Sequence, residues 1–194
     1  MSQVAATVPN NPDAILNVPN ALSSIRLVMA FGVGILIELE LYIPAMITFL
    51  IAASTDFLDG WWARKYNQVT KLGRILDPFV DKIIITAALV ALAGVEGSRV
   101  LPWMVTLIIG REFLVTSLRA MIEGSGGDFS ARWLGKWKMV VQCAAVVASL
   151  LLLDNASSAF YLWSTIILMW AAVIITVASG ADYVTQAMKM SRIK

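Results

Sequence analysis

Histidine is absent from the 194 residues, and cysteine occurs once, as Cys143. Without histidine the chain has no Ser-His-Asp or Cys-His nucleophile, no histidine acid or base, and none of the usual catalytic zinc sites. A single cysteine forms neither an internal disulfide nor a thiolate cluster, and its apolar neighbours favour a packing role. Any chemistry must therefore use carboxylates, cations, hydroxyls or a bound metal ion.

Charge is also scarce in this chain. Charged residues make up 14% of it, against roughly 25% in soluble domains, whereas hydrophobic residues reach 59% before glycine is counted. A soluble protein of this size cannot bury so much apolar surface, and a disordered chain would be polar and rich in charge. The net charge of +2 is too small to indicate nucleic-acid binding. The composition predicts an integral membrane protein, in which the 15 basic and 13 acidic residues are the informative ones.

Six apolar segments are long enough to cross a bilayer, which takes about 20 helical residues. They run approximately over 20–38, 42–63, 77–96, 100–122, 134–153 and 158–182. Because hydrocarbon requires every backbone polar group to be paired internally, each segment is expected to be a helix. The sequence therefore predicts an all-α integral membrane protein, with a six-transmembrane-helix bundle in a single domain over 13–194 and a flexible tail over 1–12.

Basic residues gather between the second and third segments, between the fourth and fifth, and in the C-terminal tail. They are Arg64, Lys65, Lys71, Arg74, Arg132, Lys136, Lys138, Lys189, Arg192 and Lys194. The other three connections are mainly acidic, and Arg99 is their only cation. Cytoplasmic loops of membrane proteins are enriched in lysine and arginine. Since six spans put both ends of the chain on one side, both termini are predicted to be cytoplasmic, in a bacterial inner or cell membrane.

Four carboxylates lie where the second and third segments meet. They are Asp56, Asp59, Asp77 and Asp81. The first two belong to the run 56–64, Asp-Phe-Leu-Asp-Gly-Trp-Trp-Ala-Arg, whose polar and small residues repeat at three- and four-residue steps and so share one helix face. The other two are four residues apart, and Pro78 suits the first position of a helix, with Asp77 as its N-cap. We expect all four carboxylates to converge at the cytoplasmic interface.

Oxygen ligands without histidine or cysteine suit hard cations such as Mg²⁺, Mn²⁺ or Ca²⁺. Two such ions would roughly neutralise the cluster and form a clamp for diphosphate oxygens. Gly60, Ala63 and Gly73 would leave room for a nucleotide, and Arg64 could hold a phosphate through paired hydrogen bonds. The alternative is a solvated patch in which the acids pair with neighbouring cations. Because ionisable residues in spanning segments are costly, a functional site is favoured, for either phosphate chemistry or ion transport.

The pattern D-x2-D-G-x2-A-R-x8-G-x3-D-x3-D is met in full from Asp56 to Asp81. It resembles the signature of the CDP-alcohol phosphotransferases. The resemblance implies two divalent cations, Mg²⁺ or Mn²⁺, ligated by Asp56, Asp59 and Asp77, with Asp81 also close to metal. In this family pattern Asp81 is the general base: it deprotonates the acceptor hydroxyl, which attacks the lipid-side phosphorus, and CMP leaves. The resemblance also implies a homodimer.

The same resemblance implies a pocket for the CDP-linked lipid. Its residues would be Asn20, Ser23, Gly60, Ala63, Arg64, Thr70 and Gly73. For Asn20 and Ser23, which lie at the start of the first predicted helix, a helix cap remains the alternative.

Cations in and beside the fourth and fifth segments point to the acceptor. They are Arg111, Arg119, Lys136 and Lys138. Several cations facing one cavity would suit a phosphorylated acceptor better than a neutral alcohol. The alternative is that cations here anchor helices at anionic headgroups. It applies to Arg119, Arg132, Lys136 and Lys138, above all to Arg132 and Lys138, and less to Arg111, which lies deeper and beside Glu112.

Beyond the signature, segments 17–26, 111–119 and 134–138 resemble the phosphatidylglycerophosphate synthase branch of the family. This resemblance implies phospholipid biosynthesis, with transfer of a phosphatidyl group from CDP-diacylglycerol to glycerol 3-phosphate. Inositol phosphate or another alcohol is the alternative acceptor. A divalent-cation transporter that uses the same acids is the alternative of another class, although transport sites tend to lie at the membrane midplane between inverted repeats.

Overall fold

The computed structural model describes residues 18–66, 71–124 and 133–191. Within these ranges it describes the backbone alone at 18–20, 56–66, 71–79, 81, 121–124, 133–136, 186 and 189–191. The described residues form six helices: α1 (Val18–Glu38), α2 (Tyr42–Tyr66), α3 (Lys71–Ala93), α4 (Pro102–Gly124), α5 (Trp133–Asp154) and α6 (Ala159–Ser191). The predicted tail over 1–12 lies outside the described residues.

Each of the six predicted apolar segments corresponds to one of these helices, so the all-α prediction is confirmed for the described part of the chain. The largest differences are at the start of α3 and the end of α6. Because α3 begins at Lys71, the prediction of Asp77 as an N-cap is wrong, and Asp77 and Pro78 lie in the second turn of the helix. Proline is typical of helix starts, but here the helix continues through it. Pro78 has no N–H to donate to the carbonyl group of Arg74, so α3 lacks that one backbone hydrogen bond.

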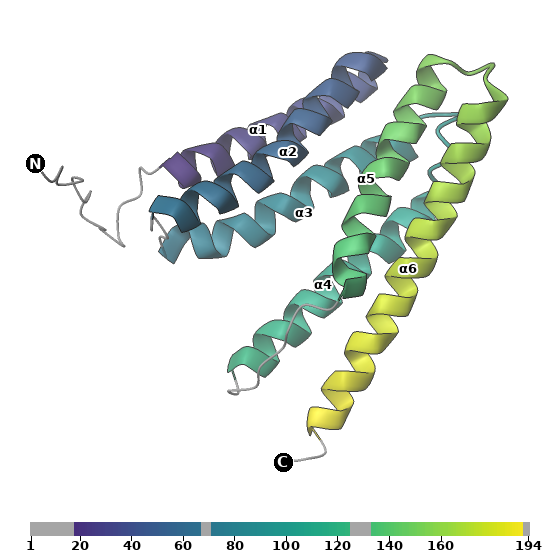
Figure 1. Ribbon diagram of the computed structural model, residues 1–194. Helices are drawn as coiled ribbons and strands as arrows, with labels where there is room; N and C mark the ends of the chain where they lie inside the picture. The colour runs from purple at the N-terminus through teal and green to yellow at the C-terminus, as the bar shows by residue number, and fades with distance from the viewer. Residues whose placement is uncertain (1–17, 67–70, 125–132, 192–194) are drawn as a thin grey trace, which may run out of the picture.

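The helices form two groups of three. Helix α1 packs against α2 and α3, and α6 packs against α4 and α5. Between the groups, α2 contacts α5, and α3 contacts both α4 and α5. In Figure 1 the three described turns, between α1 and α2, α3 and α4, and α5 and α6, lie together at the upper right. The opposite ends of the two groups diverge, toward the left and toward the bottom of the view.

The turn end of the bundle is held by its own polar contacts and by the apolar core. The hydroxyl of Ser149 on α5 donates to the carbonyl oxygen of Ser98 at 2.7 Å, and the Ser98 hydroxyl accepts from the N–H of Val100 at 3.2 Å. Among the described side chains, the main core cluster draws on the half of each helix that is nearer these turns. Its members include Val33, Ile37, Phe49, Ile84, Leu89, Leu92, Met104, Ile108, Val146, Leu150 and Met169.

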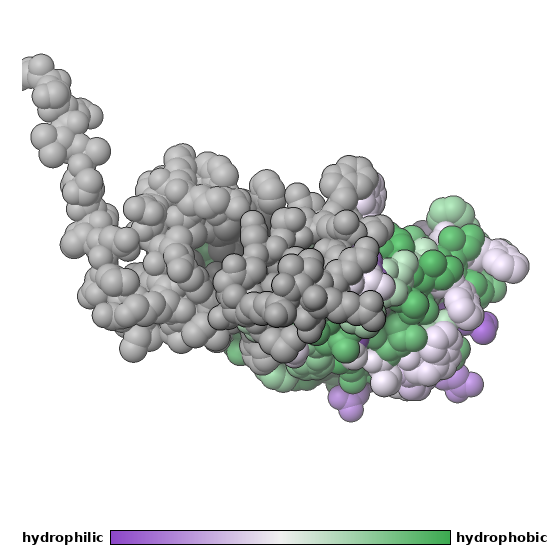
Figure 2. Space-filling view, turned by 90° about the horizontal axis from the view of Figure 1, so that it is seen from below, coloured by the Kyte–Doolittle hydropathy of each residue, from purple (hydrophilic) through white to green (hydrophobic). Residues whose placement is uncertain are grey.

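The outward faces of the helices are apolar. Val28, Phe31, Phe113 and Phe160 are each more than 60% exposed, and Figure 2 shows hydrophobic residues over much of the coloured surface, with hydrophilic ones near its edge. Within the described parts of the chain, three stretches are long and apolar enough to cross a membrane: Ala21–Glu38, Trp137–Asp154 and Ala159–Thr185. Shorter apolar stretches occupy Tyr42–Thr55 and Lys82–Ala93. Exposed apolar faces of this kind suit contact with lipid.

Candidate active site

The backbone of the aspartate signature is divided between two consecutive helices. Positions 56 to 64 lie in the second half of α2, and Gly73, Asp77 and Asp81 lie in the first half of α3. These helices contact one another, and helical spacing keeps positions 56, 59, 60 and 63 on one side of α2. Thr70 lies outside the described residues, as do the side chains of the four aspartates. Among the described side chains no group of three or more possible ligands is placed to hold a metal ion, so the metal site stays a prediction.

The start of α1 is brought to the same end of the bundle. Figure 1 shows it beside the end of α2 and the start of α3, with which α1 packs. Asn20 is in the first turn of α1, and Ser23 in the next turn is 1% exposed. Arg26, one turn further, is also buried and is among the largest fully buried side chains. A buried guanidinium requires compensating polar groups. Arg26 is the only basic residue in α1, and a lone cation in an apolar helix is a signal that the sequence already carries.

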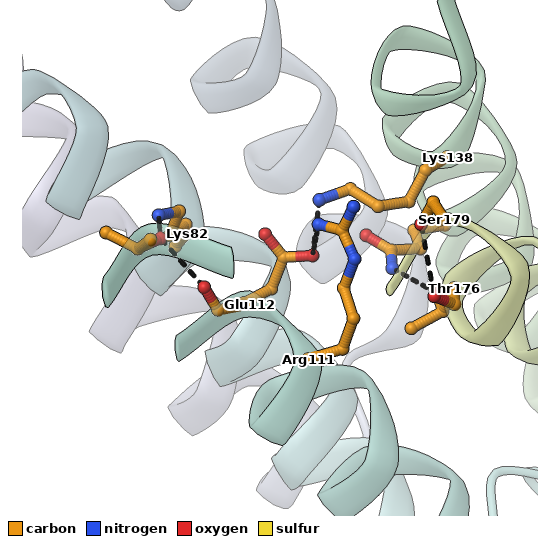
Figure 3. Close-up of polar contacts among 8 residues, drawn as sticks. Lys82, Arg111, Glu112, Lys138, Thr176 and Ser179 are labelled. Carbon is orange, nitrogen blue, oxygen red and sulfur yellow. Dashed lines mark hydrogen bonds and ion pairs between the residues drawn. The ribbon is translucent and has the colours of Figure 1, made fainter. Parts of the chain in front are cut away.

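A second polar cluster joins α4 to α5. Arg111 is 8% exposed, and its Nη1 donates to Oε1 of Glu112 at 3.1 Å. The ammonium group of Lys138 donates to the same carboxylate oxygen. Figure 3 shows the Glu112 carboxylate beside both cations. Two positive charges thus share one negative charge in a largely buried place, and the group carries a net charge of +1.

The edge of the Arg111 guanidinium formed by Nε and Nη2 has no hydrogen-bond partner among the described residues, and both nitrogen atoms are buried. These two N–H groups point in parallel, the arrangement that binds two oxygen atoms of a carboxylate or phosphate. Leaving a buried charged donor unpaired costs more than the roughly 1–3 kcal/mol of a neutral one. An oxyanion would satisfy both of these donors.

Other residues join this cluster to the helices around it. Lys82, next in the chain to Asp81, donates from Nζ to the hydroxyl of Thr116, which donates to the carbonyl oxygen of Glu112 at 2.7 Å. This contact fixes α3, just after the aspartate signature, to α4 beside Arg111. Cζ of Arg111 lies over the ring of Tyr183 on α6.

One turn beyond Lys138, a small network of polar side chains joins α5 to α6. Gln142 donates from Nε2 to Oγ1 of Thr176 at 3.2 Å, and the hydroxyl of Ser179 donates to the carbonyl oxygen of Thr176 at 3.0 Å (Figure 3). These side chains are buried. Paired polar groups of this kind specify how two helices meet, so the network sets α6 against α5 close to the cations.

The four cations predicted for the acceptor are distributed unevenly. Arg111 and Lys138 meet at Glu112. Arg119 lies two turns, about 12 Å, further along α4, where it is partly buried. The backbone of Lys136 is in the first turn of α5, and its side chain is outside the described set. The sequence did not indicate Lys82, Thr116 or Tyr183, because a lone lysine, threonine or tyrosine in an apolar helix carries no signal of its own.

Comparison with known proteins gives consistent results. The profile of a family described as CDP-alcohol phosphatidyltransferase matches residues 16–178. A Bacillus subtilis (strain 168) protein named CDP-diacylglycerol–glycerol-3-phosphate 3-phosphatidyltransferase is 43% identical over 145 residues, 73% of this chain and 72% of the relative. A probable phosphatidylglycerophosphate synthase of Mycobacterium tuberculosis (strain H37Rv) is 35% identical over 184 residues, 90% of this chain and 83% of that one. A Haemophilus influenzae protein with the same name as the first is 31% identical over 177 residues, 88% and 93% of the two chains.

Proposed function

Since the chain belongs to the CDP-alcohol phosphatidyltransferase family, we propose that it transfers a phosphatidyl group from CDP-diacylglycerol to glycerol 3-phosphate. The products are phosphatidylglycerophosphate and CMP. The names of the three relatives support this acceptor. The enzyme acts in phospholipid biosynthesis from within the membrane.

The observation that carries the choice of acceptor is the buried, unpartnered edge of Arg111. A phosphate monoester offers two oxygen atoms to Nε and Nη2 and supplies the negative charge that the net positive cluster lacks. The hydroxyls of a neutral alcohol supply no such charge, so they leave the desolvated guanidinium poorly compensated. Lys138 lies close enough to Glu112 to add a second cation to the same site. The cluster therefore favours a phosphorylated acceptor.

The donor side is the aspartate signature. Asp56, Asp59, Asp77 and Asp81 form a donor set of carboxylates alone, which fits two Mg²⁺ or Mn²⁺ ions. Divalent cations in such a site stabilise negative charge on a diphosphate. Gly60, Ala63, Arg64, Thr70 and Gly73, with Asn20 and Ser23 at the start of α1, bind the CDP-linked lipid.

Each proposed site residue has a distinct role in the transfer reaction. Asp81 accepts the proton of the acceptor hydroxyl, whose oxygen forms a bond to the phosphatidyl phosphorus. The bond between that phosphorus and the oxygen of the CMP phosphate breaks, and CMP leaves with the electron pair. Arg111 and Lys138 hold the acceptor phosphate, and Arg119 and Lys136 add positive charge on the acceptor side. The contact between Lys82 and Thr116 keeps Asp81 in register with them.

Orientation and assembly complete the proposal. The basic residues beside the signature and in the C-terminal tail put this end of the bundle, and both termini, in the cytoplasm. All six helices span the membrane, α2 and α3 with their apolar halves and with the charged site at one interface. The enzyme is a homodimer, as expected from the family.

Purified protein with CDP-diacylglycerol, Mg²⁺ or Mn²⁺ and a panel of acceptors tests this function. The panel contains glycerol 3-phosphate, inositol phosphate, inositol, glycerol and serine, and the readouts are CMP release and the lipid product. We expect the highest kcat/KM with glycerol 3-phosphate, and loss of CMP release in Asp81→Asn. A preference for an unphosphorylated alcohol contradicts the proposal. Absence of CMP release with every acceptor would instead favour a transport role for the acids.

A further inference from the structure

Two residues of α6 lie directly against Arg111. The ring centroid of Tyr183 is 5.3 Å from Cζ of the guanidinium, and Tyr183 is 3% exposed. One turn earlier, a Cβ atom built on Gly180 would lie 3.2 Å from Cγ of Arg111, closer than ordinary van der Waals contact. Residues three apart share a helix face, so α6 presents both to the same side chain. Both lie beyond residue 178, where the match to the family profile ends.

These contacts complete the restraint of the guanidinium. Glu112 accepts from Nη1, and a single hydrogen bond to the neighbouring residue leaves the guanidinium plane free to turn about that bond. Cζ lies over the Tyr183 ring, which restrains the guanidinium on that side and packs in turn against Val115 of α4. Gly180 allows α6 to approach the aliphatic stem at Cγ. Nη1 is thus hydrogen-bonded, the ring restrains one side and α6 contacts the stem, whereas Nε and Nη2 have no hydrogen-bond partner among the described residues.

We propose that Gly180 and Tyr183 are positioning residues for the acceptor phosphate. They hold Arg111 so that its Nε and Nη2 edge is oriented before the acceptor arrives. The inference rests on the proposed function, in which Arg111 binds a phosphate monoester. Preorganised donors bind more tightly because less conformational freedom is lost on binding, so removing the restraint weakens acceptor binding while leaving the donor site intact.

Two pairs of variants test the proposal. Tyr183→Leu removes the aromatic face, whereas Tyr183→Phe keeps it, because the attraction of a cation to the ring does not require the hydroxyl. Gly180→Ala adds a methyl group against the stem of Arg111. Gly110→Ala is its matched control, since it makes the same change beside Arg111 on α4 at a position with no heavy atom within 4 Å. Both alanines gain helix propensity equally.

Steady-state kinetics are measured for glycerol 3-phosphate and CDP-diacylglycerol separately, together with the thermal unfolding midpoint of each variant. We expect the acceptor KM to rise about tenfold in Tyr183→Leu, by loss of an interaction of the usual cation–π strength. It should rise severalfold in Gly180→Ala, because the added methyl group displaces the stem of Arg111. The KM for CDP-diacylglycerol should stay within about twofold of wild type. Tyr183→Phe and Gly110→Ala should keep the wild-type acceptor KM.

An unchanged acceptor KM in Tyr183→Leu and Gly180→Ala overturns the inference and leaves the proposed function standing. A rise in the KM of both substrates that parallels a fall in the unfolding midpoint also overturns it, because that is a purely structural effect. If wild type prefers another phosphorylated alcohol, the choice of glycerol 3-phosphate fails, and the same comparison made with that acceptor decides the inference. If wild type prefers an unphosphorylated alcohol, both fail.

Discussion

Replacing Arg111 with lysine separates charge from geometry at the acceptor site. Lysine keeps the positive charge but offers a point-like ammonium in place of two parallel N–H groups. In the structure Nε and Nη2 are both buried and have no hydrogen-bond partner among the described residues, so on the proposed function the native side chain makes two charge-assisted hydrogen bonds to a phosphate. Each such bond contributes about 1.5–3 kcal/mol, and lysine retains roughly one of them. The expected loss is about 2 kcal/mol, or roughly 30-fold in kcat/KM for glycerol 3-phosphate.

The assay is CMP release, first at varied glycerol 3-phosphate with saturating CDP-diacylglycerol, and then at varied CDP-diacylglycerol with saturating glycerol 3-phosphate. The control is Arg99→Lys, the same substitution at an exposed arginine in the turn at the opposite end of the bundle. We expect Arg111→Lys to lower kcat/KM for glycerol 3-phosphate but not for CDP-diacylglycerol, and we expect Arg99→Lys to match wild type for both substrates. An Arg111→Lys enzyme with native kcat/KM for glycerol 3-phosphate would refute the reasoning, as would an equal loss for both substrates.

Three further perturbations have defined outcomes. Glu112→Ala leaves Arg111 and Lys138 as unpaired, largely buried like charges and should lower the free energy of unfolding by about 3 kcal/mol. Added inorganic phosphate should raise the unfolding midpoint of this variant more than that of the exposed control Glu96→Ala. An unfolding midpoint of Glu112→Ala equal to that of wild type would contradict the pairing. Chelation with EDTA should abolish CMP release, and Mg²⁺ or Mn²⁺ should restore it; activity that persists in EDTA would exclude the proposed role of the four aspartates. Thr116→Val removes the hydroxyl between Lys82 and the carbonyl of Glu112 and should lower kcat severalfold with the fold retained. Thr106→Val removes a hydroxyl that donates to Pro102 of its own helix, and it should leave kcat unchanged. Equal kcat values in the two variants would show that the contact between Lys82 and Thr116 does not align the two sites.

Helix number and type were predictable because a long apolar segment in hydrocarbon has few conformations open to it. The start of α3 was not, because charged residues and Pro78 interrupt the apolar residues of its first turns, and the continuous apolar stretch begins only at Lys82. Proline is also common at helix starts, so its presence favoured the wrong boundary.

The acceptor cluster was partly predictable for a similar reason. Arg111 and Lys138 are costly in an apolar segment, and that cost draws attention to them. Their shared partner, Glu112, is adjacent to Arg111 in the chain and was therefore visible beside it. Tyr183 and Gly180 were not predictable, since tyrosine and glycine are ordinary residues in a membrane helix. Their importance depends on how closely α6 approaches α4, which is a property of the packed bundle.

The divergence of the two three-helix groups has a consequence for handling the enzyme. The described apolar core and the contact of Ser149 with Ser98 hold the turn end together, whereas the opposite end carries the charged residues that we propose to bind both substrates. A ligand that contacts both groups at that end would hold them together where the described apolar core does not extend. Any ligand that binds only the folded state stabilises that state by mass action. Nucleotide and phosphate ester should therefore protect the protein from detergent and protease, most of all at the ends of α2 and α4. In the cell, the same linkage would make the lifetime of the enzyme depend on the supply of its substrates.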